Sequence, residues 1–168
     1  AAAGDAMLKT MEAFAVAKKD ALYVMDLIAK AAAGGTMEVP DLSKFIPRVA
    51  SSAAGAGVSI EDTFASLEAI SFYAGTAEEG TSLLKSMYES LAMAGDETQR
   101  SSEGLLSVLQ DLWRQTGGNR AELQKLVGSQ EAVNAISKLA TDDFARLKKG
   151  MNDMADASGT TAAGLAER

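Results

Sequence analysis

Two pairs of adjacent carboxylates are the residues best suited to chemistry: Glu61 with Asp62, and Glu78 with Glu79. Paired carboxylates are the usual acid and base of glycoside hydrolysis. Both pairs, however, stand where a helix is expected to begin, and the helix dipole favours acidic side chains at that end. Aromatic residues make up only 5% of the chain, and none gathers near these pairs to line a sugar cleft. We therefore expect the four carboxylates to act as helix caps.

Cysteine and histidine are both absent from the sequence. Their absence removes thiol nucleophiles, disulfides, imidazole bases and the usual ligands of zinc, copper and haem. A carboxylate-bridged metal in a helical bundle normally uses Glu-x-x-His, which cannot occur here. We expect no enzyme: no catalytic residue, no cofactor-binding residue and no metal ligand.

The net charge is −7 and the pI is about 4.6. Affinity for DNA comes mainly from Lys and Arg on phosphates, so this balance argues against tight nucleic-acid binding. The two lysine pairs, Lys18-Lys19 and Lys148-Lys149, are isolated and lie near acidic residues. No apolar run reaches about 18 residues, so we expect no membrane span.

Residues 5–33 have the pattern of one long amphipathic helix. Alanine, leucine and methionine are strong helix formers, and apolar residues recur on one face, at Met7, Met11, Phe14, Ala21, Met25 and Ile28. Gly34-Gly35 is a typical helix stop. At about 1.5 Å per residue this helix would reach roughly 40 Å. Its apolar face must pack on this chain or on another copy.

About six shorter helices are expected between residues 36 and 156, each ending at a glycine or opening on a hydroxyl cap. The expected caps are Ser59 with Asp62, Thr76 with Glu79, Ser129 and Thr141. Pro47 should kink or split its helix, and Gly104 falls inside a helix predicted for residues 98–115.

The predicted fold is therefore all-α, an irregular helical bundle. It divides into a long helix at 1–35, a compact core domain at 36–156, and a flexible tail or the start of a next helical segment at 157–168. Gly57 and Gly75 are expected to adopt positive φ at helix ends, and Gly80 should let another backbone approach closely.

From Leu42 to Leu91 the chain resembles the core region of phage tail tape-measure proteins of the minor-tail type. The pieces that carry the resemblance occur in the family's order: Ala54–Ser59, Glu61-Asp62, Ala74–Thr76, Glu78–Thr81 and Leu83-Leu84. A looser resemblance continues over 123–132, where Val127 replaces a usual Phe. Pro47 and the added Gly55 depart from the pattern. About two thirds of the chain fits the plan.

The resemblance implies a structural component of a bacteriophage or prophage tail. The chain would be a fragment of the tape-measure protein, which sets tail length and assists tail assembly and DNA ejection. Tail-tube proteins, tail-tip proteins or other copies of the chain would be its partners, with a homo-oligomer in the virion. Its place would be the tail lumen, and the host cytoplasm during assembly. A start at Ala1 without Met and an end within polar helical sequence also lead us to expect a piece of a longer protein.

Two alternatives remain from the residues alone. One is a non-enzymatic adaptor or chaperone-like module that binds proteins through a methionine-rich groove. Its methionines would be Met7, Met11, Met25, Met87, Met93, Met151 and Met154. We prefer these methionines as core residues. The other alternative is a cell-wall hydrolase that uses the four carboxylates named above.

Overall fold

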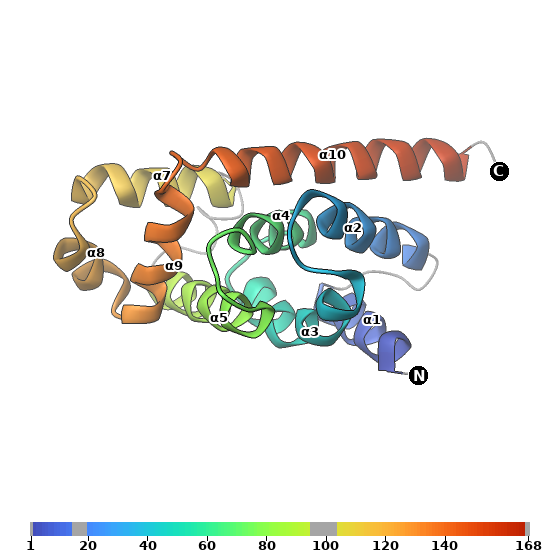
Figure 1. Ribbon diagram of the computed structural model, residues 1–168, viewed down its shortest axis with the longest axis horizontal. Helices are drawn as coiled ribbons and strands as arrows, with labels where there is room; N and C mark the ends of the chain where they lie inside the picture. The colour runs from blue at the N-terminus through green and yellow to red at the C-terminus, as the bar shows by residue number, and fades with distance from the viewer. Residues whose placement is uncertain (1, 15–19, 95–103, 167–168) are drawn as a thin grey trace.

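The computed structural model describes residues 2–14, 20–94 and 104–166, and all regular structure within them is helical (Figure 1). The fold class is all-α, as predicted. The helices are α1 (Ala2–Ala13), α2 (Ala21–Gly34), α3 (Val39–Gly55), α4 (Ile60–Ile70), α5 (Ala77–Ala94), α7 (Leu105–Thr116), α8 (Arg120–Val127), α9 (Gln130–Ala140) and α10 (Ala145–Ala166).

The single long helix predicted for residues 5–33 is wrong. α1 ends at Ala13 and α2 begins at Ala21, while residues 15–19 lie outside the described part of the chain. α1 packs mainly on α3, whereas α2 packs on α10 and α4 (Figure 1). The change of direction lets Met11 and Leu27 both enter the core, which one straight rod could not do. No glycine or proline marks the change in the sequence.

Three of the predicted caps are confirmed. The backbone amide of Asp62 donates to Ser59 Oγ at 3.0 Å, that of Glu79 to Thr76 Oγ1 at 3.0 Å, and that of Ala132 to Ser129 Oγ at 3.3 Å. Glu79 also accepts from the amide of Gly75 at 2.9 Å. Each bond satisfies an amide that the first helical turn leaves free.

The helix starts at Gly104 and Thr141 differ from the prediction. Gly104 is the residue before α7, with φ of +83°, and not a residue inside a helix; residues 98–103 of the predicted helix lie outside the described part. Thr141 instead ends α9, and its hydroxyl donates to the Ser137 carbonyl. Near the start of α10, the carboxylate of Asp142 accepts from the amide of Arg146 at 3.2 Å.

Pro47 lies within α3, which is not split there. Gly57 has the expected positive φ, at +76°, but Gly75 does not. At Gly80 an added Cβ would meet side-chain atoms of Ile70 and Met37 at 3.2 Å. Other side chains, not another backbone, therefore use the space that this glycine leaves.

The C-terminal segment belongs to α10, which continues without a break from Ala145 to Ala166. Residues 157–166 thus continue the helix that begins at Ala145. The division of the chain at residues 35 and 156 stays a prediction.

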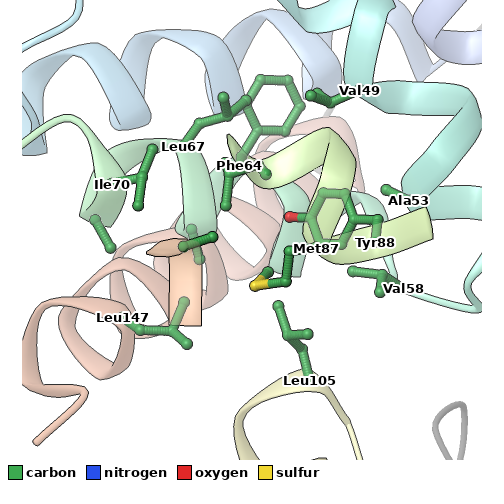
Figure 2. Close-up of a cluster of buried hydrophobic side chains, with 14 of the residues drawn as sticks. Val49, Ala53, Val58, Phe64, Leu67, Ile70, Met87, Tyr88, Leu105 and Leu147 are labelled. Atoms are coloured by element: carbon green, nitrogen blue, oxygen red, sulfur yellow. The ribbon is translucent and has the colours of Figure 1, made fainter. Parts of the chain in front are cut away.

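The core is centred on α4 and α5. Phe64, Met87 and Tyr88 are fully buried there and stand at the centre of the cluster in Figure 2, with Leu105 of α7 and Leu147 of α10 at its edge. Among the described side chains, four methionines are buried and fill core space, Met11, Met37, Met87 and Met154, while the side chain of Met7 lies outside the described part. Met25 and Met93 are exposed, so the methionines do not share one surface groove.

Candidate functional site

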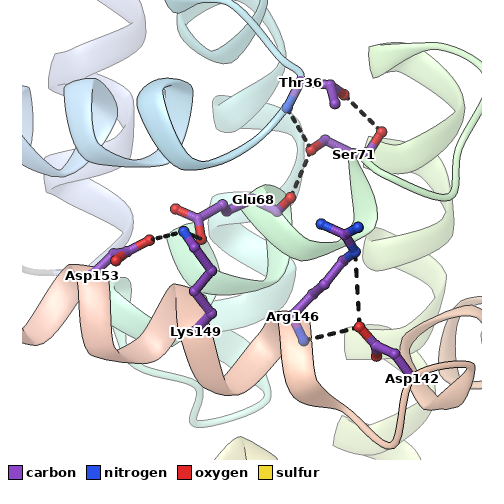
Figure 3. A network of polar contacts seen from close by, with 7 residues as sticks. All are labelled: Thr36, Glu68, Ser71, Asp142, Arg146, Lys149 and Asp153. Atoms are coloured by element: carbon purple, nitrogen blue, oxygen red, sulfur yellow. Dashed lines mark hydrogen bonds and ion pairs between the residues drawn. The ribbon is translucent and has the colours of Figure 1, made fainter.

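The most unusual chemical feature of the described residues is a carboxylate buried between α2, α4 and α10. Glu68 of α4 has a side chain that is only 1% exposed. The ammonium of Lys149, on α10, lies 3.7 Å from Glu68 Oε2 and 2.8 Å from Asp153 Oδ2, one turn further along (Figure 3). Glu68 Oε1 has no hydrogen-bond donor among the described residues. We call Glu68, Lys149 and Asp153 the buried polar cluster after its buried member, Glu68; the side chains of Lys149 and Asp153 are 58% and 29% exposed.

Two glycines make room for this cluster. A Cβ added to Gly34, at the end of α2, would collide with the Glu68 carboxyl and lie 2.9 Å from Asp153 Oδ2. One added to Gly150, on α10, would lie 2.9 Å from the Ala65 carbonyl oxygen and 3.2 Å from Glu68 Oε2. The three helices therefore approach closely only because both positions lack a side chain.

Burial raises the pKa of Glu68 to about 7, since a charged carboxylate is poorly solvated there. Asp153 adds to the rise through a hydrogen bond and charge repulsion, and Lys149 opposes it. For Asp153 partial burial is outweighed by hydrogen bonds with Lys149 and Glu68, and its pKa is lowered. The hydrogen bond to Asp153 raises the pKa of Lys149. Near neutral pH the cluster can thus exchange one proton at Glu68 while Lys149 and Asp153 stay charged.

Neighbouring contacts fix the same end of α4. Ser71 Oγ accepts from the Thr36 amide at 2.9 Å and donates to the Glu68 carbonyl at 2.6 Å, and the Thr36 hydroxyl donates to the Ser71 carbonyl at 2.7 Å. The Arg146 guanidinium lies 3.7 Å from the centre of the Phe72 ring, a cation–π geometry. Figure 3 shows the Thr36–Ser71 contacts on one side of the cluster and Arg146 with Asp142 on the other.

The four carboxylates that opened the sequence analysis each have a structural partner. Glu61 accepts from the Tyr23 hydroxyl at 2.9 Å, and Glu78 lies 3.6 Å from Arg48 on the surface. Glu79 caps α5, as described above.

Asp62 accepts from the amide of Leu105, the first residue of α7, at 3.4 Å. Burial raises its pKa, and it lines a cavity of about 140 Å³ together with Ser59 and Leu105. These contacts join helix ends to their neighbours, as capping residues do.

Sequence analysis did not single out Glu68. The sequence does indicate its position, because Glu68 stands four residues after Phe64 and so lies on the same helix face as that apolar residue. In the described residues no group of three acidic side chains is placed to hold a metal ion. No helix in that part of the chain has the length and hydropathy to cross a membrane.

Comparison with known families gives one result. The family model for phage-related minor tail proteins matches residues 1–167. The chain belongs to this family. Membership indicates a structural, non-enzymatic component of the virion that contacts other components of the phage tail. No curated protein and no solved structure gives a significant match to the chain.

Proposed function

We propose that this chain is a segment of the tape-measure protein of a phage or prophage, the tail protein that sets tail length and assists tail assembly and DNA ejection. The observation that carries the proposal is the family match over residues 1–167, together with the ordered tape-measure motifs between Leu42 and Leu91. Those motifs coincide with α3, α4 and α5 and the turns between them.

The motif residues are the ones that hold this part of the fold together. Ser59 caps α4, and Thr76 with Glu79 caps α5. Leu83 and Leu84 are buried in the core. The resemblance therefore follows residues with a structural task, which supports a shared fold for this stretch.

The packed helical bundle suggests how much length this segment contributes to a tape-measure protein. As one continuous helix, 168 residues would span roughly 250 Å; a compact domain of this size is about 40 Å across. We propose that the segment is a folded station within a longer tape-measure chain, located in the tail lumen and, during assembly, in the host cytoplasm.

Its partners would be tail-tube proteins, tail-tip proteins or other copies of the chain. Large apolar side chains are exposed at several points on its surface, at Leu8, Leu22, Met25, Val39, Phe72, Met93 and Leu126. These are candidate contact points. The net charge of −7 would keep the segment from holding DNA that leaves through the same tube.

An in-frame deletion of residues 36–156 from the phage gene tests the proposal. Tails measured by electron microscopy should be shorter than wild-type tails, because the tape-measure protein has lost residues that contribute to its length. The matched control is Glu78→Gln, which changes an exposed carboxylate but removes no residue, and should leave tail length unchanged. Normal tails at wild-type length in the deletion phage would contradict the proposal.

A further inference from the structure

We propose that α10 is a releasable arm, held on α2 and α4 by a latch at Glu68 that opens when this carboxyl loses its proton, while α3, α5 and α9 remain folded. This property belongs to the chain itself and does not rest on the proposed role in tail length.

The first support is where α10 is held. It packs chiefly on α4 and α2, through a stripe of buried residues at Leu147, Gly150, Met154 and Ala157. Glu68 lies opposite the middle of this stripe. The packing of α3 on α5 and of α5 on α9 involves other surfaces, so it can persist without α10.

The second support is the balance of charges around Glu68. Lys149 and Asp153, on α10, face Glu68. Lys30, on α2, interacts electrostatically with Asp153. With a proton on Glu68, the charges of Lys149 and Asp153 cancel. Without it, two carboxylates share Lys149, and the charge on Glu68, whose side chain is only 1% exposed, is buried with incomplete pairing, which is unfavourable.

Glu68 cannot relieve this charge while α10 stays in place. Its Oε1 has no donor among the described residues, and α2 and α10 pack closely against the carboxyl at Gly34 and Gly150. Detachment of α10 would expose the Glu68 carboxylate to water, while Lys149 is already more than half exposed in the closed form. Because the pKa of Glu68 is about 7 in the closed form, the carboxyl loses its proton near neutral pH, and attachment of α10 becomes less favourable there.

The third support is a hinge at the start of α10. Asp143 and Phe144 have φ of 57° and 60°, a left-handed backbone that is uncommon for residues other than glycine. Phe144 is only 1% exposed, so it anchors the turn to the core. In Figure 1 the far end of α10 extends past α2, leaving the arm supported along one side.

Hydrogen exchange measured by mass spectrometry between pH 5.5 and pH 8.5 tests the latch in the whole chain. Protection factors for residues 145–157 are compared with those for residues 130–140 of α9, after correction for the intrinsic exchange rate at each pH. In the wild type the α10 value should fall about tenfold or more relative to α9 as pH rises. In Glu68→Gln, which mimics the protonated acid, the ratio should stay constant.

Two further variants sharpen the test. Glu78→Gln removes an exposed carboxylate paired with Arg48 and should behave as wild type. Asp153→Asn leaves Lys149 to pair with ionised Glu68 alone, so the fall in α10 protection with rising pH should be smaller than in wild type. An equal fall in Glu68→Gln and wild type, a joint loss of protection in α9 and α10, or a fall in Asp153→Asn as large as in wild type would each overturn the latch.

Discussion

Gly150 of α10 meets the backbone of Ala65 of α4 so closely that a Cβ at Gly150 would lie 2.9 Å from the Ala65 carbonyl oxygen and 3.1 Å from its Cα. Real Cβ atoms almost never come this close to a backbone oxygen. One turn beyond Ala65, the Glu68 carboxyl lies in the same interface. Close helix approach and the buried acid therefore depend on the same glycine.

Gly150→Ala should destabilise the chain by about 1–3 kcal/mol, the usual range for overpacking. The change favours the helix by about 1 kcal/mol, but the neighbour is backbone and cannot move aside cheaply. Urea unfolding measures the difference. Gly55→Ala is the matched control, since nothing lies within 4 Å of an added Cβ there, and it should be neutral or stabilising. Equal stabilities for the two variants would contradict the close approach.

Stability should depend on pH through Glu68. Its folded pKa of about 7 lies above the ordinary 4.5, so the folded state binds the extra proton. The stabilisation is complete below pH 4.5 and is lost as pH rises towards 7, by at most about 3 kcal/mol. Unfolding of wild type and Glu68→Gln at pH 5 and pH 8 checks this.

The wild type should lose stability relative to Glu68→Gln between the two pH values. Asp62, whose pKa is also raised, contributes a loss of the same sign to both proteins and cancels in the comparison. A constant difference between the two proteins would show that Glu68 does not titrate in this range.

Gly128→Ala should cost about 1 kcal/mol. Gly128 follows α8 with φ of +76°, and nothing lies within 4 Å of an added Cβ. The cost of the substitution therefore comes from backbone strain at positive φ and not from a steric clash. Gly128→Asn should lose less, since asparagine tolerates this conformation better. Thermal unfolding compares the two, and a more stable Ala variant would contradict the strain argument.

Ser59→Ala should lower the free energy of unfolding by about 1 kcal/mol, because the Asp62 amide loses its acceptor at the start of α4. Ser51→Ala, at an exposed site within α3, is the control and should change little. Chemical denaturation measures both. Equal effects would mean that the Ser59 hydroxyl does not act as a cap.

Sequence reasoning succeeded where the information was local. The caps at Ser59, Thr76 and Ser129 connect residues three apart, so composition and spacing alone reveal them. The break between α1 and α2 was missed because no residue marks it; it serves the packing of Met11 and Leu27 into one core.

The buried polar cluster was missed for a related reason. Glu68 meets Lys149 and Asp153 only after α10 has folded back on α4, across about eighty residues of chain. Gly34 was correctly taken as a helix stop, yet its contact with Glu68 depends on tertiary packing. Local patterns predicted the all-helical class and three helix caps of this family member, but not the division of its first helix or its buried acid.

Tail length in phage whose gene carries an in-frame duplication of residues 1–168 tests the central claim most directly. A ruler with an added folded station should give tails longer by about 40 Å, and one that extends the duplicate as continuous helix should give about 250 Å. Electron microscopy separates these outcomes, and either increase supports a tape-measure role. Infectious particles that incorporate the duplicated protein but keep tails of wild-type length would contradict it.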